Sequence, residues 1–232
     1  MPHSTVDPRW AKVLSLAVHE FRTPMTVVSG YIRMLLKERA GPLTDQQRKL
    51  LEEAEKSCVR LSALIAEVSE LSSLEGGTAT FNRLDVDLRA ILREAVDGLP
   101  ETPDRPVAID LQLQPGPAAS KGDAVRLKSA FTSVLTALRR ELIASSTLVV
   151  REIVRPLDDT SASWLAIADP DRITGLADAD LSTLTTFDEW RGGCGMTLAN
   201  ARRIFEAHQG RIWSPAAESK AGAVIALPHL RE

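Results

Sequence analysis

Cysteine is scarce in this chain of 232 residues, which contains only Cys58 and Cys194. The two lie far apart in the sequence and lack the close spacing of metal ligands, so we expect no structural metal site. Their small number also excludes a scaffold held together by several disulfides. Unpaired cysteines are typical of a reducing compartment, and the sequence therefore predicts a cytoplasmic location.

Long apolar runs and an excess of basic charge are also missing. No apolar stretch approaches the roughly 20 residues that a helix needs to cross a bilayer, and the N-terminus lacks the pattern of a signal peptide. The formal net charge is −3. Without a basic field to attract nucleic acid or an anionic membrane, we expect neither a nucleic-acid partner nor direct membrane contact in this chain.

Helical periodicity dominates the first third of the sequence. Two sets of mostly apolar residues recur with alternating steps of three and four, which is the a/d pattern of helix bundles. The first set is Leu14, Val18, Phe21, Met25, Val28, Ile32 and Leu35, and the second is Leu50, Ala54, Ser57, Leu61, Leu64, Val68 and Leu71. Between them Gly41–Thr44 breaks the pattern, and Thr44 with Gln47 predicts a capping box that opens the second helix. We expect an antiparallel helical hairpin. Its apolar stripe exceeds what one partner helix can cover, which predicts a dimeric four-helix bundle.

The most informative run lies on the first of these helices and reads His19-Glu20-Phe21-Arg22-Thr23-Pro24. Residues four apart share a helix face, so the hydroxyl of Thr23 lies one turn from the ring of His19. Pro24 cannot donate a hydrogen bond to the carbonyl of Glu20, which loosens the helix at this point. A zinc-protease helix would require a second histidine where Thr23 stands. The plain alternative is a solvated histidine beside an incidental proline.

The sequence changes character after Glu75–Thr78, where two glycines end the second helix and mark a domain boundary. Beyond this point helical and strand patterns alternate. Strands are predicted at 81–85, 107–113, 148–154, 164–168, 211–214 and 223–227, and helices at 88–99, 123–143 and 196–207. This order predicts an α/β sandwich with helices over one face of a mixed sheet, and the whole chain is of the α+β class.

The run from His19 to Pro24, on a helical hairpin ahead of an α/β domain, resembles the H-box of sensor histidine kinases. The resemblance implies a dimerisation and histidine-phosphotransfer domain over residues 9–76 and a catalytic ATP-binding domain over residues 77–232. It implies that His19 accepts the γ-phosphoryl group of ATP and that Glu20 orients the ring or takes its proton. Arg22 would steady phosphate charge. Thr23 would position the water that hydrolyses a phospho-aspartate on the receiver domain of a response regulator.

Several residues of the second half resemble the ATP site of the same family. Gly193 and Gly195 precede a predicted helix, as in the family's second glycine box, where backbone N–H groups meet phosphate oxygens. Asp169 ends a predicted strand and matches the aspartate that binds the adenine amino group, although a plain turn carboxylate is the alternative. Arg140 lies near the family's basic residue. The resemblance thus implies ATP and Mg²⁺ as cofactors.

Other positions depart from the family pattern. The metal-binding asparagine position falls on Ala137, and the asparagine position before it falls on Ser133. Alanine has no oxygen to coordinate Mg²⁺. No asparagine occurs from residue 83 to residue 199, so no shift of the alignment restores one.

The segment after Asp169 departs as well. Pro170-Asp171-Arg172-Ile173 stands where the family has glycines, and Asp171 adds negative charge where a polyphosphate would lie. Residues 174–191 would form a short, altered ATP lid, in which Phe187 and Trp190 are predicted to be packing anchors.

These observations support two hypotheses. The first is a two-component signalling protein of the histidine-kinase type: a homodimer that is phosphorylated on His19 and exchanges the phosphoryl group with an aspartate of a response regulator. The second is a pseudokinase, or a histidine phosphotransferase or phosphatase, whose C-terminal domain does not bind ATP and acts as a docking module. A structural dimer that keeps the box as a relic is a third reading, but a scaffold has no need of Glu20, Arg22 and Thr23.

Overall fold

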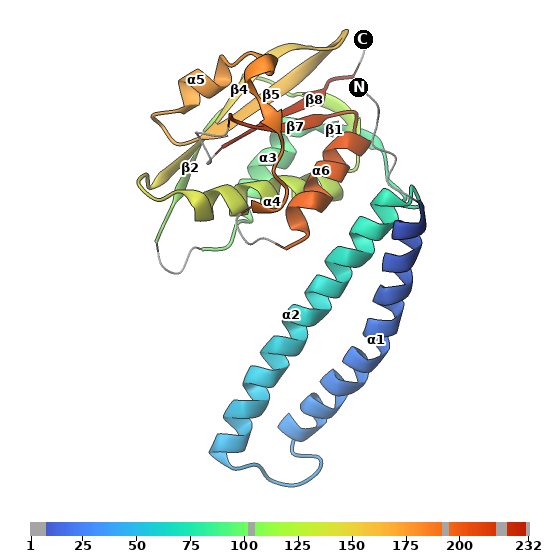
Figure 1. Cartoon of the computed structure of the whole chain (residues 1–232). Coiled ribbons are helices and arrows are strands. Elements are labelled where there is room, and N and C mark those ends of the chain that lie inside the picture. Colours follow the sequence, from blue (N-terminus) through green and yellow to red (C-terminus); the bar gives the residue numbers. More distant parts are fainter. Residues whose placement is uncertain (1–7, 102–104, 192–194, 217–221, 231–232) are drawn as a thin grey trace. The chain divides into compact units, whose positions relative to one another are not determined.

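The computed structural model describes residues 8–101, 105–191, 195–216 and 222–230. The chain divides into two compact units, one over residues 1–79 and the other over residues 80–232 (Figure 1). Each unit is described by itself below. None of the helices within these described ranges is long and apolar enough to cross a membrane.

The first unit is an antiparallel helical hairpin made of α1 (Pro8–Leu36) and α2 (Asp45–Glu75) (Figure 1). The capping box predicted at Thr44 is confirmed: its side chain accepts a hydrogen bond from the backbone N–H of Gln47, whose side chain accepts from the backbone N–H of Thr44. At the open end of the hairpin, Ser72 Oγ donates to the carbonyl of Ala11 over 2.7 Å. α2 ends where the sequence predicts, because Gly77 adopts the left-handed conformation, with φ of +65°, that turns the chain.

The apolar stripe of the hairpin stays on the surface of a single chain. Among its large side chains, Phe21 is 60% exposed, Leu61 48% and Leu64 45%, while Val18 is 5% exposed. Two helices bury only the seam between them, so the rest of the stripe faces solvent until another surface covers it. This exposure is what the prediction of a dimeric bundle requires.

The second unit is a mixed α/β domain with two sheets. Its strands are β1 (Leu84–Asp87), β2 (Ala108–Gln112), β3 (Ala119–Gly122), β4 (Thr147–Leu157), β5 (Thr160–Ala168), β6 (Thr185–Thr186), β7 (Arg211–Ser214) and β8 (Ala223–Pro228). Its helices are α3 (Leu88–Asp97), α4 (Ala124–Glu141), α5 (Ile173–Ala177) and α6 (Thr197–Ala207), with a short 3-10 turn, η1 (Leu181–Thr183). The main sheet has the order β2-β4-β5-β8-β7-β6, and β1 pairs with β3 separately. β2 runs parallel to β4, and the other neighbours are antiparallel, so the predicted mixed sheet is confirmed.

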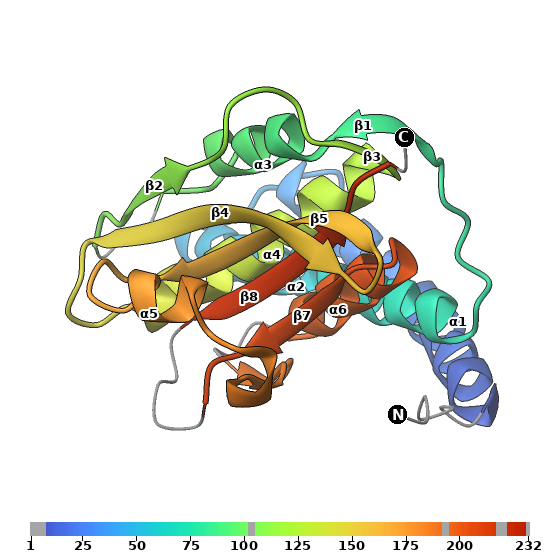
Figure 2. The same cartoon turned by 90° about the horizontal axis from the view of Figure 1, so that it is seen from above.

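Helices cover both faces of the main sheet, whereas the sequence predicted one. α3, α4 and α6 lie together on one face, and α5 lies on the other (Figure 1 and Figure 2). Ile173 and Ala177 of α5 pack against Val149 of β4 and Ala166 of β5. Because both faces are covered, every residue of β5 from 162 to 168 is buried. A helix of five residues is too short to show a hydrophobic period, so the sequence does not predict it.

The first strand of the domain begins later than predicted, at Leu84 instead of residue 81. The ring of Phe81 packs edge-on against the buried ring of His208, with 5.4 Å between the ring centroids. The backbone N–H of Asn82 donates to Asp123 Oδ2 over 3.0 Å. These side-chain interactions hold the segment before β1 in place, and no sheet ladder is needed there.

Candidate functional site

His19 projects from the surface of α1. Its side chain is 78% exposed and that of Glu20 is 71% exposed. His19 Nδ1 lies 3.5 Å from Glu20 Oε1, at the outer limit of a hydrogen bond. A carboxylate accepts only, so this contact favours the tautomer with the proton on Nδ1 and leaves the lone pair on Nε2. That nitrogen is available to solvent and to a partner as a nucleophile.

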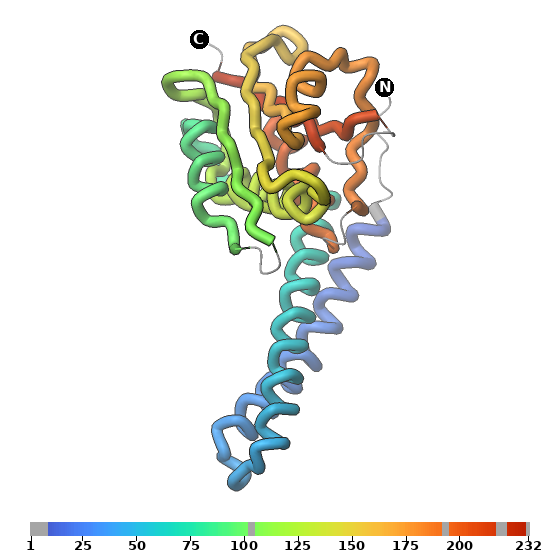
Figure 3. The backbone as a smooth tube through the Cα atoms, turned by 90° about the vertical axis from the view of Figure 1, so that its left-hand side faces the viewer, coloured from blue at the N-terminus to red at the C-terminus, as the bar shows by residue number. Residues whose placement is uncertain are grey.

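The helix continues through Pro24, and its coils run without a break along α1 (Figure 3). Proline cannot donate to the carbonyl four residues earlier, which is that of Glu20. One turn below, Thr26 Oγ donates to the carbonyl of Arg22 over 2.9 Å. Thr23 is exposed. Because it is four residues after His19, its hydroxyl lies on the same side of the helix as the imidazole ring.

Arg22 lines a groove of about 450 Å³ between α1 and α2. The groove is open and its other lining residues include Ser29 and Gly30 of α1 and Ser62 and Ala66 of α2. Small side chains on both helices leave this space. The structure therefore places Arg22 beside a depression in the hairpin surface, close in sequence to His19.

Asp169 ends β5, as predicted, but its carboxylate is already bound within the domain. Oδ1 accepts from the backbone N–H groups of Asp171 and Arg172, each over 3.1 Å. Oδ2 accepts from Arg172 Nε over 2.6 Å and also contacts Nη2 of the same guanidinium. Burial works to raise the pKa of Asp169, but the hydrogen bond and charge of Arg172 outweigh it and hold that pKa below its usual value.

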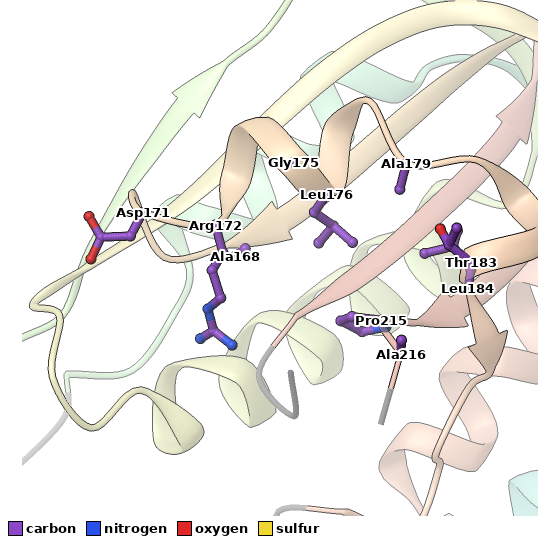
Figure 4. A pocket seen from close by; sticks show the side chains of 10 residues that line it. All are labelled: Ala168, Asp171, Arg172, Gly175, Leu176, Ala179, Thr183, Leu184, Pro215 and Ala216. Carbon is purple, nitrogen blue, oxygen red and sulfur yellow. The ribbon is translucent and has the colours of Figure 1, made fainter. Parts of the chain in front are cut away.

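Two cavities meet at this turn. One, of about 480 Å³, is lined by the end of α4, residues 142–145, and Asp169–Arg172. The other, of about 400 Å³, lies between α5 and Pro215–Ala216. Figure 4 shows Leu176 projecting into the second cavity, while Arg172 stands at one side and Asp171 points away from it.

The remaining predicted residues lie at separate positions. Arg140 is an exposed residue in the last turn of α4. Gly195 adopts a φ of +63° just before α6, which suits a turn into a helix, and Gly193 lies outside the described residues. Phe187 is 3% exposed and is the packing anchor that the sequence predicted, but Trp190 is 67% exposed, so that part of the prediction is wrong.

The residues present do not fit ATP and Mg²⁺ held in the way that the resemblance implies. Ala137, at the metal position, is fully buried in the apolar side of α4 and offers no oxygen. An adenine amino group would have to displace Arg172 from Asp169, and that hydrogen bond is charge-assisted.

Two arginines that the sequence analysis did not single out shape this region. Arg172 could have been anticipated, because it follows Asp169 by three residues and an intervening turn brings the two together. Arg191 could not, because its partners come from elsewhere in the chain. Its Nε lies 3.4 Å from Glu141 Oε1 and its Nη2 donates to the carbonyl of Gly222 over 2.8 Å.

Known proteins resemble the chain in both units. The family model of the His Kinase A (phospho-acceptor) domain matches residues 9–77, which include the run from His19 to Pro24. The circadian input-output histidine kinase CikA of Synechococcus elongatus is 27% identical over 205 residues, covering 86% of this chain and 27% of that protein. The sensor protein SphS of the same organism is 31% identical over 226 residues, covering 88% of this chain and 50% of that protein. The chain thus spans half or less of the length of these relatives.

Two solved structures share the fold. The crystal structure of full-length ShkA in complex with AMPPNP has a TM-score of 0.64 at 20% identity, covering 98% of this chain and 47% of that one. The histidine kinase AdeS of Acinetobacter baumannii has a TM-score of 0.55 at 17% identity, covering 92% of this chain and 98% of that one. The α+β prediction is confirmed. The phospho-acceptor match over residues 9–77, together with relatives along most of the chain that are histidine kinases, supports a sensor histidine kinase core.

Proposed function

We propose that the chain is the phosphotransfer core of a two-component signalling protein, in which His19 carries a phosphoryl group and exchanges it with an aspartate on a receiver domain. The observation that carries the proposal is the exposed imidazole of His19 with Glu20 Oε1 at 3.5 Å from Nδ1, inside the residues that match the phospho-acceptor family. A reducing, cytoplasmic setting belongs to the same proposal.

The groups that this chain contributes to phosphoryl transfer all lie at the surface of α1. Nε2 of His19 attacks phosphorus in line, a P–N bond forms, and the P–O bond to the leaving oxygen breaks. Positive charge develops on the imidazole, and Glu20 stabilises it or takes the proton from Nδ1. Arg22 supplies a cation for the phosphoryl oxygens. The reverse step returns the phosphoryl group to a carboxylate by the same route.

The active unit in this proposal is a homodimer. The exposed stripe that includes Phe21, Leu61 and Leu64 supplies the contact surface, and pairing two hairpins would form the four-helix bundle. A twofold arrangement brings the same patch of both copies together. His19 lies outside this stripe, because it directly follows the stripe position Val18 and consecutive residues of a helix point to different sides.

Chemical loading of the protein tests the proposal without any nucleotide. The intact chain is treated with potassium phosphoramidate, a small phosphoryl donor to imidazoles, and the label is mapped by mass spectrometry. We expect an acid-labile phosphoryl group on His19 and its transfer to at least one member of a panel of purified receiver domains. A label confined to other histidines, or one that no receiver domain accepts, would contradict the proposal.

A second candidate function, dephosphorylation of the receiver domain, is favoured by the exposed hydroxyl of Thr23 one turn from the imidazole. Thr23→Ala should slow hydrolysis of a phosphorylated receiver domain about 100-fold, because a misplaced water loses the alignment that in-line attack needs. Loading of His19 should not change. Hydrolysis is followed by loss of phospho-receiver on phosphate-affinity gels.

Ser15→Ala is the matched control for this prediction, since Ser15 is an exposed hydroxyl on the same helix one turn before His19. It should leave both reactions unchanged. If Thr23→Ala hydrolyses the phosphorylated receiver as fast as the unmodified chain does, the second function is wrong.

A further inference from the structure

Asp169 has no hydrogen-bonding capacity left for a nucleotide base. Its side chain is only 12% exposed, and both oxygens already accept hydrogen bonds: Oδ1 from two backbone N–H groups and Oδ2 from the guanidinium of Arg172. A neutral amino group on a base offers a weaker hydrogen bond than a guanidinium does. Exchange of the guanidinium for the amino group of a base is therefore unfavourable.

Arg191, which precedes Gly193 and Gly195 in the sequence, is also held by contacts within the domain. Arg191 is 9% exposed in its side chain and lies against Glu141 at the end of α4, with the guanidinium 5.2 Å from the ring centroid of Phe187. Its Nη2 donates to the carbonyl of Gly222, just before β8. Burial raises the pKa of Glu141, and the charge of Arg191 works against that rise. One side chain thus ties three segments of the domain together.

The charges at the turn after Asp169 do not favour a polyphosphate with its metal. Asp171 adds a carboxylate beside the 480 Å³ cavity, and Ala137 leaves α4 without an oxygen ligand at the position where the family has one. Mg²⁺ needs hard oxygen ligands and normally bridges the phosphates that it helps to position. The residues that remain offer internal ion pairs instead of a metal–nucleotide site.

We propose that Arg172 blocks the carboxylate of Asp169, and that His19 receives its phosphoryl group from an aspartyl phosphate on a receiver domain and not from ATP. This rests on the proposed role of His19 as phosphoryl carrier. In the transfer, the P–O bond of the aspartyl phosphate breaks and the carboxylate leaves with the electron pair. The P–N bond to Nε2 forms, and the Nδ1 proton is shared with or passes to Glu20. No metal or nucleotide on this chain takes part.

Nucleotide binding by the intact chain tests the block directly. The fluorescent analogue MANT-ATP is titrated to millimolar concentration with and without Mg²⁺. The unmodified chain should show no saturable binding, and incubation with radiolabelled ATP should leave His19 unlabelled. Micromolar binding that depends on Mg²⁺, or ATP-dependent labelling of His19, would overturn the proposal.

Substitution of Arg172 should produce a gain of nucleotide binding. Arg172→Ala should make MANT-ATP binding saturable below millimolar concentration, a gain in affinity of at least about tenfold over the limit set by the unmodified chain, which corresponds to the loss of one competing charged hydrogen bond. Free adenosine should compete, and adding Asp169→Asn to the same variant should remove the gain. Arg172→Gln, which keeps most of the aliphatic stem, guards against a variant that fails to fold, with thermal melting as the check.

Arg211→Ala is the matched control, because Arg211 pairs with Asp158 on an exposed surface and its loss also removes one positive charge. It should leave nucleotide binding as weak as in the unmodified chain. If neither Arg172 variant binds better than the unmodified chain although both are folded, Arg172 is not the block and the proposal fails. Phosphoramidate loading involves no nucleotide. If the nucleotide-binding experiments contradict the role of Arg172, the proposed phosphoryl-carrier function of His19 is unaffected. If His19 cannot be loaded with phosphoramidate, the phosphoryl-carrier function is contradicted, whatever the nucleotide-binding result.

Discussion

Glu20→Gln should slow phosphoryl transfer through His19 by about 100- to 10,000-fold, the range that a positioned acid–base group contributes. The carboxylate lies 3.5 Å from Nδ1 of the ring. An amide keeps the size of the side chain but carries no negative charge, so it neither takes the proton nor stabilises the imidazolium that forms. Both side chains are exposed, and the free energy of unfolding should therefore stay within about 0.5 kcal/mol of the original.

The rate is measured as the appearance of label on the chain after mixing with a phosphorylated receiver domain. His19→Gln sets the zero of this assay. Glu53→Gln is the matched control, since Glu53 is an exposed carboxylate on α2 whose partner is Lys56 at 2.7 Å. Equal losses in the Glu20 and Glu53 variants, or no loss in either, would show that Glu20 has no part in the transfer.

Arg89→Ala should destabilise the α/β domain by about 3–5 kcal/mol, because it leaves a buried carboxylate without its counter-charge. Arg89 Nε donates to Glu152 Oε2 over 2.7 Å, and the two side chains are 6% and 0% exposed. Nη1 of Arg89 also donates to the carbonyls of Pro115 and Gly116. Ser163 and the backbone of Gln114 complete the shell of donors around Glu152, but neither carries charge.

This destabilisation should shrink in acid. Burial acts to raise the pKa of Glu152, but the hydrogen bonds from Arg89, Ser163 and Gln114 outweigh it, and the pKa lies below the usual glutamate value. A depressed pKa stabilises the fold above the unfolded-state pKa, and that contribution is lost as the pH falls through the folded-state value. Without Arg89, burial dominates and Glu152 takes up a proton. The original chain therefore loses the contribution of Glu152 on acidification, whereas the variant has no such contribution to lose, and the difference in stability between the two narrows.

Urea unfolding at about pH 7 and about pH 4 measures both effects. It is followed through tryptophan fluorescence, which comes from Trp164, Trp190 and Trp213 of the α/β domain and from Trp10 of α1. Lys128→Ala provides the comparison, because Lys128 and Glu94 form an exposed pair at 3.2 Å that should contribute at most about 1 kcal/mol. A gap between Arg89→Ala and the original chain that grows in acid would show that the charge on Glu152 does not dominate.

Local patterns predicted the hairpin and most of the α/β elements. The two helices follow from an apolar repeat sustained over many turns. Thr44 and Gly77 mark the two ends of α2, because caps are recognised from adjacent residues. α6 and β7 were predicted to within one residue for the same reason. Hydrophobic alternation and end signals are properties of short windows, so a single sequence suffices.

Elements that depend on distant partners could not be predicted. β3 consists of Ala119, Ser120, Lys121 and Gly122, none of which favours a strand; its pairing with Leu84–Asp87 makes it one. α5 is stabilised by apolar contacts with β4 and β5 and not by its own length. Both owe their conformation to packing that brings together segments far apart in the chain.

The candidate site also has a part that local sequence predicts and a part that depends on contacts between distant residues. The order of His19, Glu20 and Thr23 on one helix fixes their relative positions, and the sequence was enough to place them on its surface. The state of Asp169 depends on the rotamer of Arg172, and that of Glu141 on Arg191, fifty residues later. Sequence alone named the carboxylate at the end of β5 but not the cation that occupies it.

The indole rings of Trp164 and Trp213 stack at 5.3 Å between centroids and 5° between planes, with the Arg155 guanidinium 4.0 Å from the centroid of Trp164. Two parallel chromophores this close couple their excited states, so the α/β domain carries its own optical signature. Strands β5 and β7 hold one indole each, and the coupling exists only while β8 lies between them in register. Circular dichroism in the indole bands would thus report the pairing of these three strands separately from the helical signal of the hairpin.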